Sequence, residues 1–172
     1  SILIPAPVIA AQTCDREVVT EYSSTTSRAV LQHDLTSGSN VYASLSEGFK
    51  AGGYATYECT EPYDPEEVTS LEFGYKGSLG ENTSLNASLF RYDYTDFQVL
   101  QVVGIQTVTR NAGDATVNGL ELEALSNLND SLSMSYGLTL LDATYGEFLN
   151  TNGLEPQLGQ QQLEGKYLNN AP

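Results

Sequence analysis

Apolar and polar residues alternate along much of this chain, and a period of two residues predicts β-strands rather than helices. The clearest stretch is residues 131–140, which read SLSMSYGLTL. Its even positions are all apolar: Leu132, Met134, Tyr136, Leu138 and Leu140. A strand places such residues on one face, whereas a helix would scatter them around its whole circumference.

Weaker alternation predicts further strands in residues 30–35, 41–49, 69–79, 85–89 and 120–124, and we expect about seven strands in all. After Leu89 the phase reverses, because Phe90, Tyr92 and Tyr94 fall on the other face. A β-bulge, or an aromatic cluster on the polar face, would explain this reversal. The predicted strands are longer than those of typical soluble sheets and long enough to cross a bilayer.

The connections between these strands alternate between short and long. Short turns rich in Gly, Asn, Ser and Asp occupy residues 36–40, 80–82 and 127–130, and long connections occupy residues 54–67, 102–112 and 146–162. In an antiparallel meander, alternate connections lie at opposite ends, so tight turns gather at one end and long loops at the other. That asymmetry is typical of outer-membrane β-barrels. We therefore expect an all-β, up-and-down antiparallel meander that is part of a large transmembrane β-barrel, with further strands needed to close it.

The same alternation assigns side chains to the two faces of the predicted sheet. We expect these residues to point outward to lipid: Leu71, Phe73, Leu120, Leu122, Leu132, Met134, Leu138 and Leu140. Glu72, Lys76, Glu121 and Glu123 would line the lumen. In a soluble sheet the same polar residues would simply form the solvated face.

Composition narrows the classes of function. A formal net charge of −15 excludes a general nucleic-acid binder, because neutralising phosphates requires clustered Lys and Arg. No stretch approaches the ~18 consecutive apolar residues of a transmembrane helix. Two cysteines and a single histidine, His33, make zinc enzymes and histidine-based hydrolases poor candidates. We therefore expect no enzymatic activity, no metal site and no cofactor.

Several segments resemble the barrel domain of TonB-dependent outer-membrane receptors, and siderophore receptors in particular. They are VYASLSEGFKAGGY (41–54), YDPEEV (63–68), LEFGYKGSL (71–79), SLNASLFRYDYTDFQV (84–99), RNAGDATVNGLELEAL (110–125) and YGLTLLDATYGEF (136–148). The order and spacing of these segments carry the resemblance, which covers residues 41–172. Residues 1–20 match nothing in the family, so we expect an unassigned segment 1–20 followed by a partial receptor barrel, 21–172.

The resemblance implies a function, a location and partners. Such receptors lie in the bacterial outer membrane and import a scarce solute such as a ferric siderophore. It implies contact with outer-membrane lipid, with a small extracellular ligand such as a metal chelate, and with a TonB-type energy-coupling protein through a plug domain that this chain lacks. Nucleic acid is not an expected partner. Two alternatives are an acidic extracellular β-sandwich that acts as an adhesin or binding domain, and an outer-membrane enzyme.

The candidate site residues lie at the long-loop end. Tyr54 and Tyr57 fall in a predicted extracellular loop, where they would either contact the ligand or serve as interfacial aromatic residues. Cys14 and Cys59 are both expected at this end, which the resemblance makes extracellular and oxidising, so a disulfide could persist there. The alternative is two unrelated thiols, since pairing does not follow from sequence.

Overall fold

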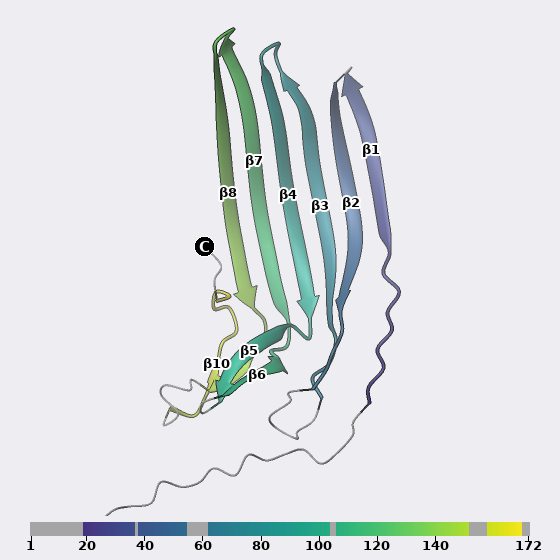
Figure 1. The fold of residues 1–172 in the computed structure, drawn as a ribbon, viewed down its shortest axis with the longest axis vertical. Coiled ribbons are helices and arrows are strands. Elements are labelled where there is room, and N and C mark those ends of the chain that lie inside the picture. Colours follow the sequence, from purple (N-terminus) through teal and green to yellow (C-terminus); the bar gives the residue numbers. More distant parts are fainter. Residues whose placement is uncertain (1–18, 37, 55–61, 104–105, 152–157, 170–172) are drawn as a thin grey trace, which may run out of the picture.

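Six long antiparallel strands form one sheet in the computed structural model, which describes residues 19–36, 38–54, 62–103, 106–151 and 158–169. The strands are β1 (Arg28–Thr36), β2 (Ser39–Lys50), β3 (Glu66–Leu79), β4 (Thr83–Thr95), β7 (Ala115–Asn129) and β8 (Leu132–Tyr145). They pair in the order β1-β2-β3-β4-β7-β8, as Figure 1 shows. The expected antiparallel meander is confirmed. Among the described residues, no helix is long and apolar enough to cross a bilayer.

Two short hairpins lie within the long connections. The first joins β5 (Gln98–Val103) to β6 (Gln106–Asn111), and the second joins β9 (Leu149–Thr151) to β10 (Gln160–Gln162). The long sheet thus has six strands rather than about seven, and residues expected as a plain loop at 102–112 belong to a hairpin. The physical reason lies at Asp96, whose φ of 52° turns the chain out of the sheet before β5 begins.

All three tight turns of the long sheet lie at one end, the upper end in Figure 1, and the two hairpins lie at the other. Gly38 and Gly80 occupy two of these turns with φ of 105° and 70°, a region that glycine adopts without steric cost. The sequence prediction of a turn end and a loop end is therefore confirmed.

The register settles the question raised by the aromatic residues of β4. The pairing of β4 with β3 runs without a shift from Thr83 to Thr95. The phase reversal after Leu89 is therefore an aromatic cluster on the polar face and not a bulge. Register shifts occur instead beside the turns, between Asp34 and Thr36 and between Asn127 and Asn129.

The two faces of the sheet differ as the sequence predicts. Residues that pair directly across antiparallel strands share a face. One such row crosses all the long strands and is apolar throughout: Leu31, Ala43, Phe73, Leu89, Leu120 and Leu140. We call the face that carries this row the apolar face. Leu89 and Leu140 remain 58% and 55% exposed, so the described residues leave this face uncovered.

Glu72, Lys76, Glu121 and Glu123 lie on the opposite face, which we call the polar face. The assignment of side chains to faces is confirmed.

The small core of the described residues lies toward the loop end. Its buried apolar members are Phe90, Val108, Ala112, Ala115, Ala143 and Tyr145. A chain of aromatic contacts runs through this region, with ring centroids 5.2 Å apart for Tyr94 and Phe97, 6.5 Å for Phe97 and Tyr145, and 5.3 Å for Tyr145 and Phe148. These contacts join the ends of β4 and β8 to the connections that follow them.

Candidate functional site

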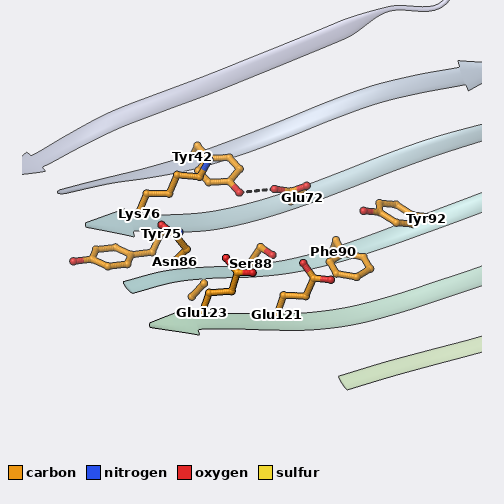
Figure 2. Close-up of a pocket in the computed structure, with 11 residues that line it drawn as sticks. Tyr42, Glu72, Tyr75, Lys76, Asn86, Ser88, Phe90, Tyr92, Glu121 and Glu123 are labelled. Atoms are coloured by element: carbon orange, nitrogen blue, oxygen red, sulfur yellow. Dashed lines mark hydrogen bonds between the residues drawn. The ribbon is translucent and has the colours of Figure 1, made fainter. Parts of the chain in front are cut away.

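The polar face carries a cavity of about 250 Å³ near the middle of the sheet, shown in Figure 2. The charged and polar side chains that line it from the polar face come from neighbouring strands: Tyr42, Glu72, Lys76, Asn86, Ser88, Tyr92, Glu121 and Glu123. Strand alternation brings these side chains together, because every second residue of β2, β3, β4 and β7 points to this face. The cluster therefore follows directly from the period of two seen in the sequence.

Tyr42 and Glu72 form the most closely coupled pair in this cavity. The Tyr42 hydroxyl donates a hydrogen bond to the Glu72 carboxylate, across the β2–β3 pair. Lys76 places its ammonium group 5.2 Å from the centre of the Tyr42 ring, within the range of a cation–π contact. Glu121 and Glu123 add two more carboxylates from β7. The cavity is thus acidic overall, with its one lysine held beside an aromatic ring.

Two aromatic rings on this face lie over glycines, where the absence of a side chain leaves room for them. Gly74 pairs directly with Tyr42, and Gly119 pairs directly with Phe90. A Cβ atom added at either glycine would run into the ring of its partner. Each ring therefore covers the bare backbone of the neighbouring strand, an arrangement that protects glycine in sheets.

The expected ligand-contact residues lie in a different place, at the loop end. Tyr54 is half-buried and follows the short bridge between Gly53 and Tyr63, whose backbone groups exchange hydrogen bonds of 3.1 and 2.8 Å. Tyr57, Cys14 and Cys59 lie outside the described residues. The assignment of Tyr54 and Tyr57 as ligand contacts stays a prediction.

Sequence reasoning missed a group of residues that joins the long connections to one another. Asn111 and Gln98 bridge the β2–β3 connection and the base of the β5–β6 hairpin through side-chain amides. Gln101 and Asn150 hydrogen-bond between β5 and β9. No periodic pattern marks such residues, because each acts through a contact between segments far apart in sequence.

A comparison with protein families decides what kind of sheet this is. The family described as TonB dependent receptor-like, beta-barrel, matches residues 11–172. The chain belongs to this family. TonB-dependent receptors are outer-membrane β-barrels, so the chain lies in the outer membrane, and the family is one of transport receptors rather than enzymes. No curated protein sequence matches the chain.

Two solved structures show the same fold. The chain is similar to the ferric yersiniabactin uptake receptor FyuA from Yersinia pestis, with a TM-score of 0.58 and 23% identity over 68% of this chain. It is also similar to the copper transporter OprC, with a TM-score of 0.55 and 21% identity over 68% of this chain. The match covers 18% of FyuA and 21% of OprC, so this chain spans about a fifth of the length of either receptor.

In a TonB-dependent receptor barrel, the apolar face of the sheet is the lipid face and the polar face lines the lumen. The edge of the apolar region crosses the strands obliquely. One row is apolar on β1–β3 and polar on the other three strands: Ala29, Leu45, Leu71, Arg91, Asn118 and Asp142. Such a stepped boundary is expected when strands tilt relative to the bilayer normal.

The charged residues at this boundary on β4 are paired. Arg91 donates two hydrogen bonds to Asp93, of 2.8 Å from Nε and 2.7 Å from Nη2. A bidentate pair of this kind satisfies both charges at the edge of the apolar region.

The predicted disulfide can be tested directly. If Cys14 and Cys59 are bridged, an alkylating reagent modifies neither thiol until a reductant is added, and peptide mapping recovers the two residues in one linked peptide. Closing a loop of this length stabilises the folded state by about 3 to 4 kcal/mol in the chain-entropy model. Two thiols that alkylate without reduction would contradict the pairing.

Proposed function

We propose that this chain forms part of the barrel wall of a receptor that imports a small metal complex, such as a ferric siderophore, across the bacterial outer membrane. The observation that carries the proposal is a two-faced sheet of this receptor family, with an acidic, aromatic polar face and long connections gathered at one end. The two receptors of similar fold are named for a ferric chelate and for copper, which supports a metal-containing solute.

The polar face suits contact with a separate domain inside the lumen. A barrel of this family that carried an open aqueous lumen would leak, so a plug is proposed to fill it and to receive the pull of the TonB-type energy-coupling protein. The carboxylates of Glu72, Glu121 and Glu123 offer acceptors to such a plug. Glu121 and Glu123 are exposed on the described surface and available for these contacts, whereas Glu72 is half-buried and already accepts a hydrogen bond from Tyr42.

The loop end is the proposed extracellular mouth. Tyr54 and Tyr57 are proposed to contact the solute there, since aromatic rings supply large apolar contact area at small cost in conformational entropy. The similarity in fold to the copper transporter OprC makes a copper species the second candidate solute.

The proposal is tested by uptake in cells. We expect cells that express the complete receptor containing this chain to accumulate radiolabelled iron from a ferric siderophore, and to lose that uptake when the energy-coupling protein is deleted. A copper probe in the same cells distinguishes the second candidate. Absence of energy-dependent uptake with every ferric and copper probe would refute import of a metal complex.

A substitution at Tyr54 tests whether the solute binds at the mouth of the barrel. Tyr54→Ala should weaken binding of the transported solute by about tenfold if the ring is a principal contact. Tyr136→Ala on the lipid face is the matched control and should leave the Kd unchanged. Equal affinity of the Tyr54→Ala receptor and the wild type would remove Tyr54 from the site while leaving the transport proposal intact.

A further inference from the structure

Asn111, the last residue of β6, connects two loops through one side chain. Its Oδ1 accepts a hydrogen bond of 2.7 Å from the backbone N–H of Asp64, which lies just before β3. Its Nδ2 donates to the carbonyl oxygens of Asp64 and Asp96, at 3.0 and 2.7 Å. Both the oxygen and the nitrogen of the Asn111 amide are therefore hydrogen-bonded. Together these bonds hold the β2–β3 connection against the turn that follows β4.

Gln98 forms a second set of contacts between the same two connections. Its Nε2 donates to the carbonyl oxygens of Ala51 and Asp64, at 3.0 and 3.1 Å. Its backbone N–H donates to the Glu66 carboxylate at 2.7 Å. Because Gln98 and Asn111 pair directly at the base of the β5–β6 hairpin, both side chains act from one rigid unit.

The base of this hairpin lies over the polar face of the sheet. Gln98 contacts Glu66, which lies on the polar face of β3, and the Phe97 ring contacts Tyr94 of β4 and Tyr145 of β8 on the same face. Figure 1 shows β5 and β6 crossing the loop end of the sheet. In the barrel this position overhangs the lumen, and the turn at Asp96 directs the chain there.

We propose that Asn111 and Gln98 are positioning residues that join the β2–β3 connection and the β5–β6 hairpin into one fixed unit at the mouth of the barrel. The hairpin is then a permanent overhang of the lumen rather than a lid that swings on solute binding. The role of this unit as a wall of the solute site rests on the proposed function, whereas the coupling of the two loops does not.

The two loops are coupled because two side chains, those of Asn111 and Gln98, form several hydrogen bonds. The bonds to Ala51 and Asp64 run between the two connections, so neither connection can move away without breaking them. The bond to Asp96 lies within the β4–β7 connection and fixes Asn111 to the turn before β5. Three of the backbone partners belong to residues 64 and 96, which pair in no strand of the sheet. Among the described residues, the Asn111 amide is the partner of the Asp64 N–H and of the Asp96 carbonyl, so its removal takes this hydrogen bond from both groups.

The test is hydrogen exchange by mass spectrometry on the complete receptor in detergent, with no solute present. In Asn111→Ala we expect exchange to quicken by about tenfold in both the peptide covering residues 62–66 and the peptide covering residues 96–101. Gln98→Ala should quicken exchange in the first of these peptides. Asn111→Asp keeps the acceptor but loses both donated bonds, so it should release residues 96–101 as fully as alanine does.

Asn118→Ala is the matched control, because Asn118 lies on the lipid-side face of β7 and accepts only a long bond of 3.4 Å from Arg91. It should leave both peptides unchanged. The proposal fails if Asn111→Ala quickens exchange in one loop alone or in neither, or if Asn118→Ala has the same effect. Since no solute enters the measurement, these outcomes are independent of whether the receptor imports a metal complex.

Discussion

Leu138→Lys is expected to lower the free energy of unfolding of the receptor barrel in lipid vesicles by about 2 to 4 kcal/mol. Leu138 pairs directly with Leu122, on the apolar face. Both residues lie well inside the apolar region of their strands, so the new ammonium group would sit near the middle of the bilayer. The cost arises because lipid offers the charge neither water nor a counter-ion.

Thr139→Lys is the matched control, because Thr139 is the next residue and pairs directly with Glu121 on the polar face. There the ammonium group meets a carboxylate in the lumen, and we expect a change in stability within about 1 kcal/mol. Denaturant titration of the two variants in the same vesicles gives the comparison. Equal destabilisation by both lysines would contradict the assignment of the two faces.

Gly119→Ala is expected to destabilise the barrel by about 1 to 3 kcal/mol, although it adds a single methyl group. The added Cβ would occupy the space of the Phe90 ring, which is only 7% exposed. The ring also stacks on Tyr92 with centroids 4.8 Å apart, so its displacement disturbs a second aromatic side chain. The free energy of unfolding in denaturant measures the effect.

Gly137→Ala provides the control on the same face, since a Cβ atom at Gly137 meets no atom within 4 Å. Replacing glycine in such an open strand position should leave stability unchanged or raise it by about 0.4 to 1 kcal/mol, through the unfolded state. A double variant, Phe90→Ala with Gly119→Ala, should be less destabilised than the sum of the two single changes. Additive losses would show that the ring and the glycine do not interact.

The sequence alone determined the class of fold, the direction of the strands and the faces of their side chains. Each of these depends on a local period or on the length of a connection. The alternation in residues 131–140 fixes which residues share a face, because a strand turns every second side chain to the same side. The alternating short and long connections fix the turn end and the loop end. The resemblance of ordered segments then indicated the receptor family, which the family match confirmed.

Tertiary structure decided the features that depend on contacts between distant segments. The phase reversal at Phe90 had two explanations, and only the unbroken register with β3 showed that aromatic rings share the polar face. The hairpin of β5 and β6 replaced an expected loop, since its strands pair with each other and not with the sheet. The roles of Asn111 and Gln98 arise from backbone groups 47 residues away in the chain, a separation that no periodic pattern encodes. Local alternation specifies a strand, but the partner of a side-chain amide exists only once the loops have been brought together.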